Sequence, residues 1–132
     1  MRASTVSESS VVGLGVDLVE TSRVRTALAR WGGRLVAKLM APEEAALLPQ
    51  EPIARAAALA RAIAAKEAAS KALGTGWSRG VRWRDVVLLP GPRLRLDAGA
   101  AARARALGAN GETRTHLEER GDLVIGEVRL LG

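Results

Sequence analysis

Hydrophobic and polar residues alternate along residues 11–19, VVGLGVDLV. The two-residue period of a β-strand places Gly13, Gly15 and Asp17 on one face and the larger apolar side chains on the other. This segment is therefore predicted to be a strand. Because the glycines clear the face that carries Asp17, we expect a bulky group to lie beside its carboxylate.

A long alanine-rich segment has the period of a helix instead, and it is predicted to run from about residue 53 to residue 73, where Gly74 ends it. Residues four apart lie on one face of a helix. Here the column begins with apolar side chains and ends with charged ones: Leu59, Ile63, Glu67 and Lys71. We expect this face to pass from the core into a site.

The rest of the chain mixes shorter elements without a regular βαβ repeat. A first helix, which Thr21 or Ser22 could cap, is predicted to reach Arg30, and a short helix lies near residues 42–45. Further strands are predicted at 81–89, 93–97, 112–118 and 123–131, with a helix at 98–107 and turns at 90–92 and 119–122. This order indicates an α+β fold with an antiparallel sheet, as a single domain over residues 11–132 after a flexible tail at residues 1–10.

The amino-acid composition limits which metal sites and partners are possible. The chain has no cysteine and one histidine, which excludes a disulfide framework and a multi-histidine metal site. A bound metal would need carboxylate ligands, and these favour magnesium, which shares its shell with water and phosphate oxygens. The net charge of +6 favours an anionic partner. No run of about 20 apolar residues and no signal-peptide core occurs, so we expect a cytoplasmic protein without membrane contact.

The sequence KEAASKALGTG at residues 66–76 combines Lys-Glu-x-x-x-Lys with a Gly-Thr-Gly loop, and it is typical of a phosphate and metal site. Simpler interpretations exist. Glu67 and Lys71 could form an exposed ion pair, Asp17 could cap the first helix, and the glycines could serve only to end a helix. His116 could likewise be a structural strand residue.

Taken together, Gly-Leu-Gly-Val-Asp at residues 13–17, Arg23, the segment 66–76 and Thr115-His116 resemble holo-acyl-carrier-protein synthase, the small trimeric class of 4′-phosphopantetheinyl transferase. The resemblance extends over about residues 11–131. It implies an antiparallel sheet packed on a long central helix, and the transfer of 4′-phosphopantetheine from coenzyme A to a serine of an acyl carrier protein, with release of 3′,5′-ADP.

The resemblance also implies roles for individual residues. Asp17 and Glu67 would bind Mg²⁺, and the catalytic set would be Asp17, Glu67, Lys71 and His116. Coenzyme A would contact Lys66, Lys71, Gly74, Thr75, Gly76 and His116, whereas Arg23, Arg25 and Arg30 would bind the carrier protein. The implied assembly is a homotrimer, in fatty acid or polyketide biosynthesis, and nucleic acid is not expected as a partner.

The chain departs from the family pattern at several positions. Ala62 and Ile63 stand where the family has Arg and Phe, Arg61 comes one position early, and Gly111 replaces a histidine. These departures support an alternative hypothesis, in which the domain is a catalytically impaired or repurposed module that binds carrier protein or coenzyme A in polyketide-type metabolism.

Overall fold

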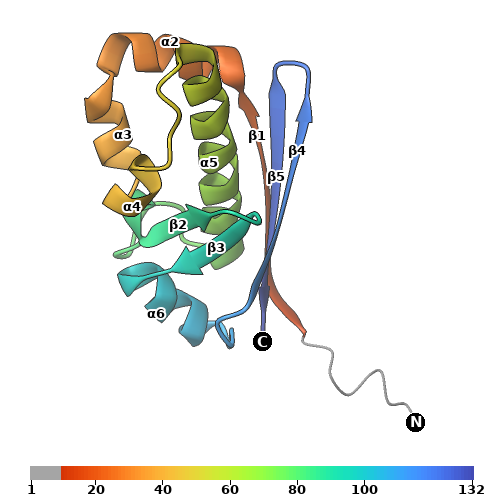
Figure 1. Ribbon diagram of the computed structural model, residues 1–132. Coiled ribbons are helices and arrows are strands. Elements are labelled where there is room, and N and C mark those ends of the chain that lie inside the picture. Colours follow the sequence, from red (N-terminus) through yellow and green to blue (C-terminus); the bar gives the residue numbers. More distant parts are fainter. Residues whose placement is uncertain (1–9) are drawn as a thin grey trace.

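The computed structural model describes residues 10–132, so residues 1–9 of the predicted tail lie outside the described part of the chain. Strands and helices follow one another in a mixed order (Figure 1). They are β1 (Val11–Glu20), α2 (Thr21–Trp31), α3 (Gly33–Leu39), α4 (Pro42–Ala45), α5 (Pro52–Leu73), a 3₁₀ turn (Trp83–Asp85), β2 (Val86–Leu89), β3 (Arg93–Leu96), α6 (Ala98–Ala106), β4 (Thr113–Arg120) and β5 (Leu123–Leu131). The predicted α+β class is confirmed.

Strands β1, β5 and β4 form an antiparallel sheet in that order, and β2 and β3 form a separate antiparallel pair. The long helix α5 packs against one face of the three-stranded sheet, and the other helices lie on the same side (Figure 1). No described helix is both long and apolar enough to cross a membrane.

Glycines in the sheet let α5 approach closely. A Cβ atom on Gly15 would lie 1.8 Å from the carbonyl oxygen of Ala68, and one on Gly126 would lie 2.7 Å from that of Ala64. Alanines on the helix complete this contact and are fully buried. The expected bulky neighbour of the glycine face is therefore the backbone of α5. The sequence did not show which element would cover this face.

Within residues 10–132, no helix covers the opposite face of the sheet. Leu14, Val16 and Leu18 of β1 point away from α5 and are 50–56% exposed. Charged side chains of β4 and β5 share this outer face, since His116 pairs with Glu127 in the register and Glu127 pairs with Val16. An apolar row of this size on a sheet is unusual unless another surface covers it.

Some element boundaries differ from the prediction. Helix α3 begins directly after the break at Gly32, and it was not predicted. The strand expected from residue 81 begins at Val86, because a 3₁₀ turn precedes it. Helix α2 is not capped by its own side chains. Asp122 in the β4–β5 turn accepts hydrogen bonds from Ser22 N at 2.9 Å and Ser22 Oγ at 2.5 Å.

Candidate active site

Asp17, Glu67 and Lys71 come together where the edge strand β1 crosses the C-terminal half of α5. Lys71 Nζ donates a hydrogen bond to Asp17 Oδ1 at 2.8 Å and another to the carbonyl oxygen of Val16 at 3.1 Å. The predicted column on α5 explains the placement, since Leu59 is buried, Glu67 is half-buried and Lys71 is exposed. The interpretation of Asp17 as a helix cap does not apply, because its carboxylate faces Lys71.

The electrostatics of these three groups favour a bound cation. Burial raises the pKa of Glu67, the Trp77 indole opposes that shift, and the negative charge of Asp17 adds to it. The hydrogen bond to Asp17 raises the pKa of the Lys71 ammonium. Two carboxylates thus share one lysine. An additional positive charge would relieve the repulsion that Glu67 experiences.

Residues 10–132 contain no cluster of three or more His, Cys, Asp or Glu that could hold a metal ion. Asp17 and Glu67 are a pair of carboxylates, which is fewer ligands than such a cluster. Two carboxylates fit Mg²⁺, which binds few protein ligands and takes its other oxygens from water and phosphate. They fit Zn²⁺ poorly, because zinc sites in proteins have three or four ligands, usually nitrogen or sulfur.

The Gly-Thr-Gly loop ends α5. Gly74 is left-handed with φ of 77°, and its N–H donates to the Lys71 carbonyl at 3.0 Å, while Gly76 N–H donates to the Ser70 carbonyl at 3.3 Å. The Thr75 hydroxyl donates to the Gly76 carbonyl at 3.0 Å. Ending the helix is therefore sufficient to explain the glycines. Contact of this loop with a phosphate stays a prediction.

Arg103 of α6 also reaches this loop, which the sequence analysis missed. Its Nε donates to the Leu73 carbonyl at 2.8 Å, and its guanidinium lies near Gly74. The signal in the sequence is weak, because Arg103 sits in an alternating Ala-Arg run of a short helix. Its position adds a positive charge beside the end of α5.

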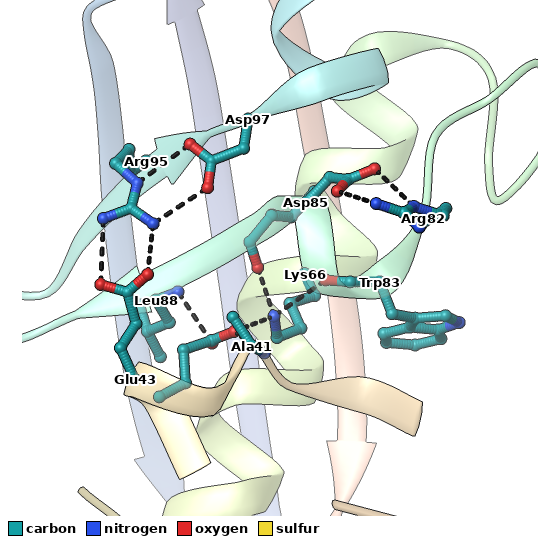
Figure 2. Close-up of polar contacts among 11 residues, drawn as sticks. Ala41, Glu43, Lys66, Arg82, Trp83, Asp85, Leu88, Arg95 and Asp97 are labelled. Atoms are coloured by element: carbon teal, nitrogen blue, oxygen red, sulfur yellow. Dashed lines mark hydrogen bonds and ion pairs between the residues drawn. The ribbon is translucent and has the colours of Figure 1, made fainter. Parts of the chain in front are cut away.

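Lys66 is not part of this site. Its side chain is fully buried, and Nζ donates to Glu44 Oε1 at 2.8 Å, to the Trp83 carbonyl at 3.0 Å and to the Val86 carbonyl (Figure 2). An ammonium group has three hydrogens to donate, and all three have acceptors here. The structure does not support the predicted coenzyme A contact of Lys66, because no donor is left for a ligand.

His116 lies on the outer face of the sheet, on the side opposite Asp17. Its imidazole is exposed, and Nε2 lies 4.0 Å from Glu118 Oε1. Asp17 faces α5, and its neighbour Val16 shares the outer face with His116. Within one chain the structure therefore does not bring His116 to the carboxylate pair.

The predicted arginines lie on α2, which begins directly after strand β1. Arg23, Arg25 and Arg30 are all exposed, and Arg23 Nε lies 3.2 Å from Glu20 Oε1. The guanidinium of Arg30 stacks over the exposed ring of Trp31 at 4.9 Å. The sequence analysis missed the continuation of this surface onto α3. There a hollow of about 320 Å³ is lined by Trp31, Arg34, Leu35 and Lys38.

A second cavity, of about 390 Å³, lies between α4, α5 and the β2–β3 turn. Its walls are mostly apolar, and Pro90, Gly91 and Pro92 of the turn close one side. Arg61 and Ala62 both line it, and Arg61 Nη1 lies 3.6 Å from Glu119 Oε2. Arg61 thus reaches the same cavity as Ala62, although it comes one position early in the sequence.

Comparisons with known proteins show the family of this chain. The family model described as the 4′-phosphopantetheinyl transferase superfamily matches residues 13–124. A curated relative from Solidesulfovibrio magneticus, holo-[acyl-carrier-protein] synthase, is 48% identical over 101 residues, which cover 74% of this chain and 80% of the relative.

Solved structures give the same fold. The holo-[acyl-carrier-protein] synthase of Neisseria meningitidis matches with a TM-score of 0.75 at 23% identity, over 92% of this chain and 98% of that chain. The Helicobacter pylori protein of the same name, solved in complex with coenzyme A, matches with a TM-score of 0.70 at 18% identity, over 90% of this chain and 99% of that chain. At these identities the likeness shows the fold.

Proposed function

This chain belongs to the 4′-phosphopantetheinyl transferase superfamily, and we propose that the Asp17, Glu67 and Lys71 cluster is its active site. The enzyme transfers 4′-phosphopantetheine from coenzyme A to a serine of an acyl carrier protein. The observation that carries the site assignment is the meeting of two carboxylates and one exposed ammonium, from segments about 50 residues apart, at one sheet edge.

Asp17 and Glu67 would hold a magnesium ion, which when bound offsets negative charge on the pyrophosphate oxygens of coenzyme A. In the reaction the serine oxygen forms a bond to phosphorus, the bond to the 3′,5′-ADP oxygen breaks, and the serine loses a proton. The carboxylates of the pair are the side chains of the cluster that can accept this proton. Lys71 directs its charge to the same place and stabilises the leaving phosphate.

Lys71 is suited to this role because its ammonium is half exposed and uses two described acceptors, Asp17 and the Val16 carbonyl. A third hydrogen therefore remains for a phosphate oxygen. The loop residues Gly74, Thr75 and Gly76 lie directly beyond Lys71. We propose that they and Arg103 bind the nucleotide phosphates, since Arg103 brings a guanidinium to the loop.

The positions of the predicted residues support a site shared between subunits. Asp17 is on the edge strand β1, whereas His116 is on the other edge strand, β4, and on the outer face. In a ring with head-to-tail interfaces, one edge of each subunit meets the opposite edge of the next. The proposed homotrimer would bury the row of Leu14, Val16 and Leu18 and bring His116 of one subunit toward Asp17 of another.

A mixing experiment tests the shared site. Asp17→Asn and His116→Ala subunits are each expected to have low transfer activity, and co-refolded mixtures are expected to regain activity, because some interfaces combine two intact halves. Light scattering after size-exclusion chromatography gives the oligomeric state. A monomer with full activity would contradict the trimer, and mixtures no more active than the single variants would contradict the shared site.

The arginine surface of α2 and α3 fits an acidic carrier protein. Arg23, Arg25 and Arg30 are all exposed on α2, with Arg23 and Arg30 on one side of the helix and Arg25 about 160° around it. The hollow around Trp31 and Leu35 adds an apolar anchor point between the basic side chains of Arg34 and Lys38. Charges on the rim of an interface mainly steer association. We therefore propose that the carrier protein docks on this surface, and that the enzyme works in the cytoplasm on carrier proteins of fatty acid or polyketide biosynthesis.

The alternative of an impaired or repurposed module is not favoured. The relatives that match at 45–50% identity are named as holo-[acyl-carrier-protein] synthases. One departure that supported this alternative was Ala62 at the position where the family has Arg. In the structure this departure is smaller, because Arg61 lines the same cavity as Ala62. Arg61 thus brings a basic residue to this cavity, with its guanidinium beside Glu119.

Intact-mass analysis tests the proposed site. Apo carrier protein incubated with coenzyme A, Mg²⁺ and this enzyme is expected to gain about 340 Da, the mass of the transferred group. Asp17→Asn and Glu67→Gln should abolish the gain while circular dichroism shows an intact fold. Glu112→Gln, which removes a carboxylate outside the site, is the matched control and should transfer normally. Transfer at near wild-type rates by both site variants would rule out the assignment.

A further inference from the structure

The indole N–H of Trp77 is buried and has no hydrogen-bond partner among residues 10–132. Burying a donor without an acceptor costs about 1–3 kcal/mol. Such groups are uncommon in folded proteins, and each one calls for a physical reason. Trp77 follows directly after the Gly-Thr-Gly loop, which Gly76 N–H ties back to the Ser70 carbonyl. The loop therefore turns back toward the C-terminal end of α5 just before Trp77.

The Trp77 ring is held in place from behind. It stacks on Trp83 with ring centroids 4.0 Å apart and an angle of 18° between the planes. Trp83 is fixed in turn, because its carbonyl accepts a hydrogen bond from the buried Lys66 ammonium (Figure 2). A rigid aromatic pair anchored in this way directs the indole edge to a defined place.

The Glu67 carboxylate is a suitable acceptor for the unpaired indole N–H of Trp77. The Trp77 indole is near enough to Glu67 to oppose the rise of the carboxylate's pKa. The geometry does not reach that of a standard hydrogen bond, since Trp77 Nε1 has no partner within those limits. A small turn of the Glu67 side chain, which is half-buried and flexible at its end, would close the bond.

We propose that Trp77 is a positioning residue for Glu67: its indole N–H binds one carboxylate oxygen and leaves the other directed at the cation site shared with Asp17. The inference rests on the proposed function, in which Glu67 is a metal ligand. Groups that hydrogen-bond a ligating carboxylate fix its orientation, and their loss typically weakens metal binding 10–100-fold. Lys66 then contributes to the site indirectly, through Trp83 and Trp77.

Magnesium affinity is the first test. Mg²⁺ is titrated calorimetrically into the full chain with saturating coenzyme A and no carrier protein, so that no turnover occurs. Trp77→Phe keeps the aromatic stack and removes the N–H, and it should weaken Mg²⁺ binding about tenfold or more. Ile53→Val, which changes an exposed apolar side chain at the start of α5, is the control and should leave Mg²⁺ affinity unchanged. Wild-type Mg²⁺ affinity in folded Trp77→Phe would overturn the proposal.

Nuclear magnetic resonance provides a second test that needs no Trp77 variant to fold well. The chain has three tryptophans and hence three indole N–H signals, which ¹⁵N labelling resolves. Adding Mg²⁺ and coenzyme A should move the Trp77 indole proton downfield, as expected for a new hydrogen bond to a carboxylate. The shift should be lost in Glu67→Gln. An unchanged Trp77 signal in the wild-type protein would contradict the proposal.

Failure of this inference is distinguishable from failure of the proposed function. If Glu67→Gln loses Mg²⁺ binding but Trp77→Phe keeps it, the metal site stands and Trp77 does not position Glu67. If Glu67→Gln also binds Mg²⁺ as the wild type does, Glu67 is not a ligand and both conclusions fall. If Trp77→Phe loses affinity and its thermal midpoint stays within a few degrees of the wild type, a general loss of structure is excluded.

Discussion

Lys66 and Lys71 lie five residues apart on α5, and each forms an ion pair with an N–O distance of 2.8 Å. The Lys66 and Glu44 side chains are 0% and 1% exposed, whereas Lys71 and Asp17 are 53% and 18% exposed. The buried pair has every donor satisfied by the protein. The exposed pair keeps a free hydrogen and lies beside a second carboxylate. The same kind of lysine–carboxylate pair therefore stabilises the fold at Lys66 and remains accessible to a ligand at Lys71.

The buried pair connects three elements. Glu44 accepts hydrogen bonds from Ala41 N at 3.0 Å, from Leu88 N at 2.9 Å and from Lys66 Nζ, and so it links α4, α5 and β2 (Figure 2). Burial lowers the pKa of Lys66, and the charge of Glu44 opposes that shift. Removing one partner of such a pair leaves an uncompensated charge in the interior.

The largest effect on stability is therefore expected at Lys66. Lys66→Met should lower the free energy of unfolding by about 3–5 kcal/mol, because Glu44 then stays buried without its counter-charge. Urea titration followed by circular dichroism measures the change. Lys38→Met, at an exposed lysine of α3, is the control and should change stability little. A loss below about 1 kcal/mol for Lys66→Met would show that the Lys66–Glu44 pair does not hold α4, α5 and β2 together.

Lys71 is expected to show the reverse pattern. Lys71→Ala should lower kcat about 10²–10³-fold, as removal of one donor to a developing charge typically does. It should change the free energy of unfolding by less than about 1 kcal/mol, because the Lys71 side chain is half exposed to solvent. Lys71→Arg keeps the charge and should retain more activity than the alanine variant. Unchanged turnover and unchanged coenzyme A affinity in Lys71→Ala would return it to a plain surface ion pair.

This contrast also shows what the sequence could predict. The four-residue column on α5 correctly placed Glu67 and Lys71 at the exposed end of the helix, because helical periodicity is a local property. It could not show that Lys66 turns into the core. That depends on Glu44, which is 22 positions earlier in the chain and whose carboxylate is oriented by tertiary contacts.

In the sheet, too, the local pattern was predictable and the long-range contacts were not. Alternation placed Asp17 and the glycines on one face of β1, which the structure confirms, but not the identity of the element on that face. His116 was chosen by resemblance, and its separation from Asp17 follows from strand pairing, which the local pattern does not specify. Arg103 was missed because it reaches the loop from α6, 30 positions after Leu73. Trp77 was missed because its position depends on how the loop turns back toward α5.

A weaker effect is expected where an ion pair is almost fully exposed, as with Arg23 and Glu20 at 83% and 48%. Reversing Arg23 and Arg30 to Glu should raise KM for carrier protein about tenfold, leave KM for coenzyme A nearly unchanged and flatten the salt dependence. Arg105→Glu, at an exposed residue of α6, is the control; it reverses one charge, so it is compared with Arg23→Glu alone. Equal losses for both substrates would show that α2 supports the fold and does not dock the carrier.

The smallest effect is expected at Glu43, the neighbour of Glu44. Its carboxylate is exposed and accepts hydrogen bonds from Arg95 at 2.5 and 3.1 Å, and the bond to Arg95 lowers its pKa (Figure 2). A lowered pKa in the folded state means that the pair stabilises the fold above the unfolded pKa near 4.5, and that this stability is lost as the pH falls through the folded value. Glu43→Gln should therefore be slightly less stable than the wild type at pH 7, and the difference should vanish in acid. Urea titrations of both proteins between pH 7 and pH 3 measure it, and a difference that stays constant with pH would show that the exposed pair acts through packing rather than charge.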